Sequence, residues 1–255
     1  MVSRRRWTRQ ELLVAFALYC RLPFGRFHHW NPEIVEIAKL IGRTPSALAM
    51  KLSNIASLDP AITSTGRRGL MGASANDRAM WEEMHSDWAQ FVIESQQAME
   101  VVRASEKSIG ESAISENDVQ IGLDRAVETT VRIGQSFFRS AVLSAYDGRC
   151  CITGLSIPSL LVASHIVPWR DDKANRLNPR NGLLLSALHD RAFDSGLLTI
   201  NDDMTVLVSQ NYREVEDEYF LQSVLRYQGR QMKLPEKFSP DPALLSYHRE
   251  RIFQG

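Results

Sequence analysis

The stretch that decides the fold is residues 161–200, which read LVASHIVPWRDDKANRLNPRNGLLLSALHDRAFDSGLLTI. Apolar runs and turn residues in and just before it predict short elements around a loop at Pro168–Gly182. These elements are strands at Cys150–Ile152, Leu160–Ile166 and Leu197–Ile200 and a helix at Ser186–Asp194, closed by Gly196. A hairpin, a long loop and a helix make a compact scaffold for a small site.

Three polar residues stand in this scaffold where composition alone does not place them. His165 lies inside an apolar run, Asn181 ends the loop, and His189 lies in the helix ahead of Asp190 and Asp194. Hydrolysis of a phosphodiester needs an activated water and a cation to neutralise the charge that develops on the phosphate. A neutral imidazole can supply the first, and a divalent metal held by imidazole, amide or carboxylate the second.

Four ordered blocks carry a resemblance to a known family: GRCCITG (148–154), ASHIVPW (163–169), NPRNGL (178–183) and LHDRAFDSG (188–196). Over residues 137–200 the chain resembles the HNH endonuclease family, most of all the branch usually named as restriction endonucleases. The resemblance implies a metal-binding fold of two strands and one helix that acts on DNA. It implies His165 as the general base, Asn181 as a brace for the loop that presents it, and His189 as a metal ligand. The implied cofactor is a divalent metal, Mg²⁺ with Mn²⁺ as the alternative.

Two features depart from the family pattern. Many members have Asp or His just before the base, where this chain has Ser164, and a hydroxyl is a poor sole replacement for those ligands of Mg²⁺. The second ligand therefore stays open between Asn181, Asp194 and a water held by Ser164. Many relatives also hold a structural zinc with paired cysteine motifs. Cys150 and Cys151 have no later partner cysteines, so we expect no structural zinc.

Each site residue also has a plainer interpretation. A histidine in an apolar run is usually a core residue, a helical histidine often only packs, and Asn181 before a glycine can be a turn residue. Asp194 stands near a helix C-terminus, where the dipole disfavours an anion unless a metal, an arginine or solvent compensates. The ordered blocks favour catalysis for His165 and Asn181 and metal binding for His189, with Asp194 as a further ligand.

The first hundred residues predict helices. Thr8 caps one helix, Pro32 opens a second that ends at Gly42, and Thr44-Pro45 begins a third. The second and third helices have the spacing of a helix-turn-helix, which can place its second helix in the DNA major groove. We expect the exposed side of that helix to offer Arg43 and Lys51 to DNA. The alternative is a helical hairpin that packs against something else.

The chain divides into a helical domain at residues 1–100, a linker at 101–132 and a nuclease domain at 133–255. Met80–Met99 has apolar residues at helical spacing, whereas the linker is rich in Ser and Glu and poor in aromatic residues. The expected fold class is α+β, with a helical N-terminal domain followed by an HNH domain.

Charge is distributed unevenly along the 255 residues, although the formal net charge is zero. Residues 1–70 carry eleven Lys or Arg against four Asp or Glu, residues 71–135 carry five against twelve, and the remainder is balanced. A basic first segment suits contact with nucleic acid. Three cysteines cannot build a disulfide framework, and Arg21 directly after the apolar run Leu12–Cys20 argues against a signal peptide or membrane segment. We therefore expect a cytoplasmic protein with DNA as partner, and a homodimer stays open.

The sequence supports a DNA endonuclease with a basic N-terminal unit that holds the duplex, as in restriction or defence. One alternative is a non-enzymatic DNA-binding regulator whose HNH unit has decayed, for which Ser164 is the evidence. The other is a nuclease that acts on RNA or as a toxin. Intact His165, Asn181 and His189 argue against a decayed unit.

Overall fold

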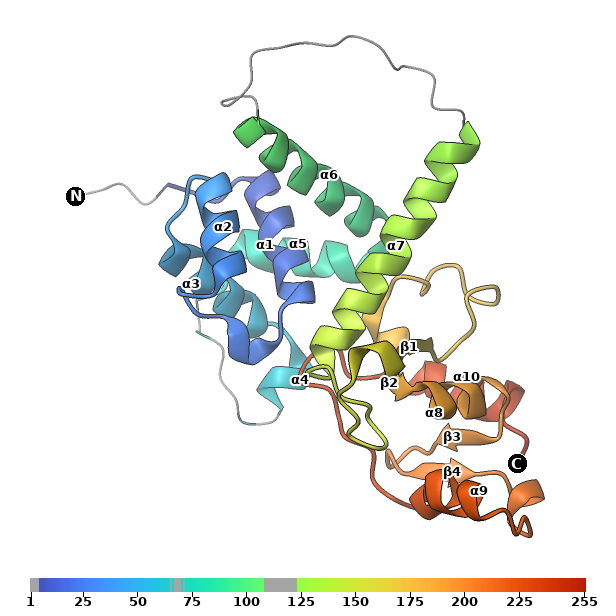
Figure 1. Ribbon diagram of the computed structural model, residues 1–255. Helices are drawn as coiled ribbons and strands as arrows, with labels where there is room; N and C mark the ends of the chain where they lie inside the picture. The colour runs from blue at the N-terminus through green and yellow to red at the C-terminus, as the bar shows by residue number, and fades with distance from the viewer. Residues whose placement is uncertain (1–4, 65, 67–69, 71, 108–122) are drawn as a thin grey trace. The chain divides into compact units, whose positions relative to one another are not determined.

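The computed structural model describes residues 5–64, 66, 70, 72–107 and 123–255. The chain forms two compact units, Met1–Phe137 and Phe138–Gly255. The first is helical, and the second combines helices with two small antiparallel sheets (Figure 1). The expected α+β class with a helical N-terminal region is therefore confirmed. No helix within these ranges is long and apolar enough to cross a membrane.

Helix α1 is the centre of the first unit and packs against α3, α5 and α6. Its Phe16 and Tyr19 are fully buried, and burial of each such side chain stabilises the fold by on the order of 2 kcal/mol. The described helices that lie wholly in this unit are α1 (Arg9–Arg21), α2 (Pro32–Leu40), α3 (Pro45–Ala56), α4 (Pro60–Thr63), α5 (Ala75–Ser86) and α6 (Trp88–Lys107), with a 3-10 turn η1 (Phe24–Arg26).

The first three helices begin where the sequence predicted, although the cap of α2 is Asn31, which the sequence analysis had not selected. Thr8 and Glu11 form a capping box on α1, and the Thr44 hydroxyl accepts the Ala47 N–H of α3. Gly42 follows α2 with φ of +63°, which lets the chain turn toward α3. The helix expected over Met80–Met99 is two helices, because Asp87 leaves the helical conformation, with φ of −149° and ψ of 89°, and its carboxylate accepts the Gln90 N–H.

The segment expected as a linker at 101–132 is helical at both ends. Helix α6 continues to Lys107, and α7 (Leu123–Ala145) begins at Leu123. The residues between these helices lie outside the described ranges. The division between the two units falls within α7, after Phe137.

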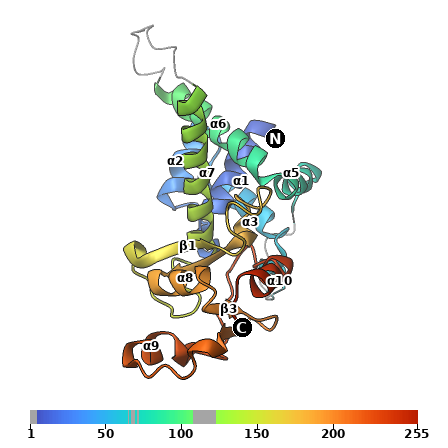
Figure 2. The same cartoon turned by 90° about the vertical axis from the view of Figure 1, so that its right-hand side faces the viewer.

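A hairpin covered by one short helix organises the second unit. Strand β1 (Leu161–His165) pairs antiparallel with β2 (Gly182–Ser186), so that His165 lies opposite Gly182. Helix α8 (Ala187–Asp194) follows β2 directly and packs against both strands. Figure 2 shows α8 beside β1. The remaining elements are β3 (Leu198–Ile200), β4 (Val206–Val208), α9 (Glu218–Ser223), α10 (Pro242–Arg251) and the 3-10 turns η2 (Pro158–Leu160), η3 (Pro179–Asn181), η4 (Gln210–Tyr212) and η5 (Leu225–Tyr227).

The strand expected at Cys150–Ile152 is wrong. The Gly154 N–H donates to the Cys150 carbonyl at 2.9 Å, which closes a turn there. The partner of β1 is β2, all five residues of which are buried. A strand buried on both faces lacks alternation of apolar and polar residues, so the sequence pattern did not identify it.

Gly182 is required where α7 crosses the hairpin. A Cβ atom at this position would lie 2.5 Å from Val142 Cγ2 and 3.0 Å from the ring of Phe138. The ring of Phe138 stacks on that of His165, with centroids 3.9 Å apart and an interplanar angle of 6°. The absence of a side chain at Gly182 therefore allows Phe138 to approach and orient His165.

Candidate active site

His165 ends β1 with its ring held on several sides. Besides Phe138 on one face, Trp169 approaches its edge at a centroid distance of 5.6 Å. Its Nε2 lies 2.9 Å from the Arg176 carbonyl oxygen, which can only accept, so Nε2 carries the proton. Burial lowers the pKa of His165, and the hydrogen bond to Arg176 opposes that change. The ring is therefore neutral near pH 7, with Nδ1 as the nitrogen that can take a proton.

Asn181 joins the end of the long loop to the chain just after β1. Its Oδ1 accepts the Val167 N–H at 2.8 Å, and its Nδ2 donates to the carbonyls of Val167 and Asn175, each at 3.2 Å. The side chain is fully buried, so these bonds are made out of contact with water. Asn181 thus fixes the backbone two residues beyond His165.

A cavity of about 390 Å³ opens beside His165. Its polar lining includes Ser164, Asp190, Asp194 and His248. Ser164 is 3% exposed, and its Oγ has no hydrogen-bond partner among the described residues. A buried hydroxyl without a partner is costly unless something absent from the protein itself satisfies it.

Asp190 and Asp194 lie four residues apart on α8 and so share one face of the helix. Burial raises the pKa of Asp194, the charge of Asp190 raises it further, and Arg191 opposes both. A cation between the carboxylates would relieve their repulsion. Two carboxylates and a hydroxyl are oxygen donors of the kind that Mg²⁺ and Mn²⁺ prefer.

The donor set is small by the standard of all-protein metal sites. Within the described ranges, no three His, Cys, Asp or Glu side chains gather into a metal-binding group. Mg²⁺ usually keeps several waters and binds through one or two carboxylates together with substrate phosphate. The side chains of Ser164, Asp190 and Asp194 therefore fit a hydrated divalent cation.

His189 does not line this cavity. It is buried, its Nδ1 lies 2.8 Å from Ser186 Oγ, and its ring meets that of Tyr227 edge to face. Burial lowers its pKa to about 4, and Nε2 is buried without a hydrogen-bond partner in the described part of the chain. The structure brings His165 and Asp194 together with Asp190, which the sequence prediction had not selected. The spacing of four residues between Asp190 and Asp194 was the signal that could have found it.

His248 of α10 completes the wall from far along the chain. Its Nε2 donates to the Phe193 carbonyl at 3.1 Å, its Nδ1 accepts from Thr199 Oγ1 at 2.8 Å, and its ring stacks on Phe193 at 3.6 Å. Burial lowers the pKa of His248 to about 4, so the ring is neutral. These contacts hold the last turn of α8, next to Asp194. No motif in the sequence pointed to His248.

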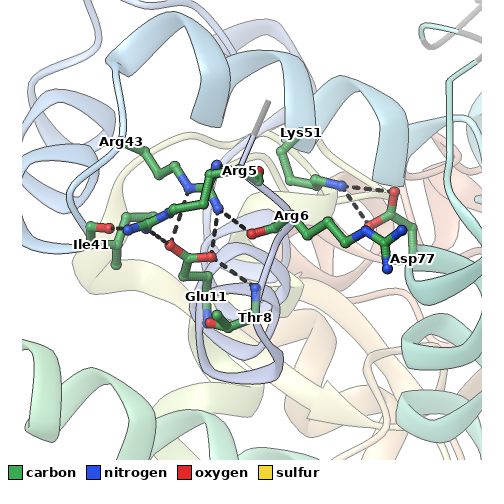
Figure 3. A network of polar contacts seen from close by, with 8 residues as sticks. All are labelled: Arg5, Arg6, Thr8, Glu11, Ile41, Arg43, Lys51 and Asp77. Atoms are coloured by element: carbon green, nitrogen blue, oxygen red, sulfur yellow. Dashed lines mark hydrogen bonds and ion pairs between the residues drawn. The ribbon is translucent and has the colours of Figure 1, made fainter. Parts of the chain in front are cut away.

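Arg43 and Lys51 do not form the exposed face expected of them (Figure 3). Lys51 is 5% exposed and donates to both oxygens of Asp77, at 2.7 and 2.9 Å. Arg43 donates to Glu11 and to the carbonyl oxygens of Arg5 and Arg6. The prediction that Lys51 is exposed is wrong, because a buried carboxylate on α5 draws its ammonium inward.

A comparison with known protein families identifies the same part of the second unit. Residues 150–201 match the family model described as HNH endonuclease. This segment contains β1, β2, α8 and β3, and with them every cavity residue named above except His248. No curated protein sequence matches the chain.

Proposed function

We propose that the chain hydrolyses DNA phosphodiester bonds with a divalent cation, on the premise that residues 150–201 match the family model described as HNH endonuclease. The observation that carries the proposal is the cavity in which His165 lies with two carboxylates and an unpartnered hydroxyl. That arrangement provides a base beside a place for a cation, which is the minimum for this hydrolysis.

His165 acts as the general base in this proposal. Its neutral ring accepts a proton from the attacking water at Nδ1, while Nε2–H stays bonded to the Arg176 carbonyl. That bond and the stacked Phe138 ring orient the base before substrate arrives. Asn181 keeps the chain beyond β1 in place and so fixes the position of His165.

Asp190, Asp194 and Ser164 would hold the cation. When bound, the cation supplies charge neutralisation on the phosphate and on the leaving oxygen. We assign metal binding to Asp190 and Asp194 rather than to His189, because His189 does not line the cavity and its Nδ1 lies against Ser186 Oγ. His189 instead supports the start of the helix through Ser186.

The first unit is proposed to hold the nucleic acid, with α2, its turn and α3 in the order of a helix-turn-helix. Restriction in the cytoplasm is the setting that such a nuclease would suit. A homodimer would supply a second active site for the opposite strand. The pattern of single-strand and double-strand cuts in a plasmid would test the homodimer.

The test of the proposal is cleavage of supercoiled plasmid DNA by the purified full chain with Mg²⁺, with Mn²⁺ and with EDTA. We expect cuts with either metal, none in EDTA, and a loss of about a hundredfold or more in His165→Ala. The matched control is His29→Ala, which removes an exposed histidine of the first unit. Cutting in EDTA, or near-normal cutting by folded His165→Ala, would refute the proposal. Cleavage of RNA but not of DNA would show that RNA is the substrate.

A further inference from the structure

A second cavity, of about 730 Å³, lies in the first unit between residues 5–7 and the first turns of α3 and α5. Its described lining contains no carboxylate. It contains four cationic side chains, Arg5, Arg6, Arg43 and Lys51. A cavity lined by charges of one sign concentrates the field inside it and attracts ligands of the opposite charge.

Two carboxylates neutralise part of this charge from behind the wall. Glu11 pairs with Arg5 and Arg43, and Asp77 pairs with Lys51 (Figure 3). Neither carboxylate lines the cavity. Four cations against two carboxylates leave an excess of positive charge, and the cations are the members of each pair that reach the cavity.

Trp7 forms part of the wall and keeps two of the cations in place. The Arg43 guanidinium carbon lies 4.6 Å, and Lys51 Nζ 5.0 Å, from the centroid of its ring. Arg6 is exposed, and its guanidinium makes no ion pair within the described ranges. Arg43 and Lys51 are thus fixed before a ligand arrives, whereas Arg6 is available to contact one.

We propose that this cavity binds the sugar-phosphate backbone of a nucleic-acid strand. Guanidinium and ammonium groups suit phosphate oxygens, and the ring of Trp7 with the exposed Met50 offers apolar surface to a sugar or base. The inference rests on the proposed function in one respect, since the strand is taken to be the substrate of the second unit. It changes the expected contacts, because Arg43 and Lys51 act from fixed positions and Arg6 is the exposed contact.

The test introduces a carboxylate at Ser46, an exposed residue in the first turn of α3 that lines the cavity. The dipole of α3 stabilises a negative charge in its first turn, so Ser46→Glu is expected to fold at least as well as the wild type. Binding of fluorescein-labelled DNA is measured by anisotropy on the full chain carrying His165→Ala, so that cleavage does not consume the probe. We expect Ser46→Glu to weaken binding at least about fivefold relative to Ser46→Gln, because it repels phosphate where a cation should attract it.

A second pair of variants removes charge without adding any. Arg6→Gln should lower the salt dependence of binding by about one ion and weaken binding to all DNA sequences alike. Arg26→Gln, which removes an exposed arginine of η1 outside the cavity, should change neither. Cleavage by the chain with His165 intact is measured separately. Failure of the nuclease proposal would appear in the cleavage assay, whereas failure of the strand-binding proposal would appear in the binding assay.

Three results would overturn the inference. The first is equal affinity of Ser46→Glu and Ser46→Gln. The second is an equal effect of Arg6→Gln and Arg26→Gln, which would indicate general charge attraction. The third is binding of inorganic phosphate as tight as that of the strand, which would make the cavity a site for free phosphate.

Discussion

Gly182→Ala should destabilise the second unit and impair its active site together. The new Cβ atom would lie 2.5 Å from Val142 Cγ2, about 1 Å inside the usual contact distance, and 3.1 Å from the Pro179 carbonyl oxygen. Val142 is fully buried, so neither its side chain nor the backbone at residue 182 can move away without disturbing the packing of α7 on the hairpin. Overpacking of this kind costs about 1–3 kcal/mol.

Urea unfolding of the full chain, followed by circular dichroism, measures this cost. With a slope of about 1–3 kcal/mol per molar urea, a loss of about 2 kcal/mol moves the midpoint of the second unit by on the order of 1 M. Cleavage should fall as well, because the displaced Phe138 ring is the one that stacks on His165. Gly25→Ala is the control, since nothing lies within 4 Å of its Cβ position.

A second substitution tests whether contact with Val142 is what destabilises Gly182→Ala. Val142→Ala removes the methyl group that the new Cβ atom would strike, so Gly182→Ala should cost little in a Val142→Ala background. The two substitutions should thus show a coupling energy of about 1–2 kcal/mol in a double-mutant cycle. Normal stability of Gly182→Ala, or additive losses in the double variant, would show that the close approach at Gly182 does not matter.

Three more predictions concern the second unit. Asp190→Asn and Asp194→Asn should each raise the Mg²⁺ concentration for half-maximal cleavage about tenfold or more, and His189→Asn much less; the opposite order would return metal binding to His189. Asn181→Ala should cost about 1–3 kcal/mol in urea unfolding, because it leaves the Val167 N–H buried without its acceptor, and Asn181→Asp should restore part of that loss. The pKa of His248 is about 4 when folded and about 6.5 when unfolded, so between these pH values the unfolded state binds a proton that the folded state does not. The free energy of unfolding is therefore highest above about pH 6.5 and falls as the pH is lowered toward 4. Unfolding at pH 5 should therefore be easier than at pH 7 by up to about 2 kcal/mol, and His248→Gln should depend less on pH; an identical pH profile would contradict this.

Local signals in the sequence predicted the elements that local chemistry determines. Thr8, Thr44 and Ser186 begin helices because each hydroxyl accepts an N–H within the next turn, and those interactions need no distant partner. His165 and Asn181 could be selected because they lie in ordered blocks around one hairpin. What the sequence could not provide was the direction of each side chain on α8.

A shift of one residue explains the difference between His189 and Asp190. Successive residues of a helix point about 100° apart, so one of them packs toward Ser186 and Tyr227 while the next lines the cavity. The inward turn of Lys51 was equally hidden, because its partner Asp77 lies twenty-six residues later on another helix. Pairings of this kind depend on tertiary packing, which a pattern of spacing does not contain.

The contacts of α10 and of the residues after it determine how short a fragment of the second unit could be and still keep the proposed active site. The Gln254 N–H donates to the Gly196 carbonyl at 2.9 Å, and a Cβ atom on Gly196 would lie 2.1 Å from the Ile252 carbonyl oxygen. With His248, these contacts close the last residues over the end of α8. A fragment trimmed to the family segment would keep the motif yet expose Phe193 to water and free the helix that carries both carboxylates. A working graft of this centre into another scaffold therefore has to carry residues 242–254 as well.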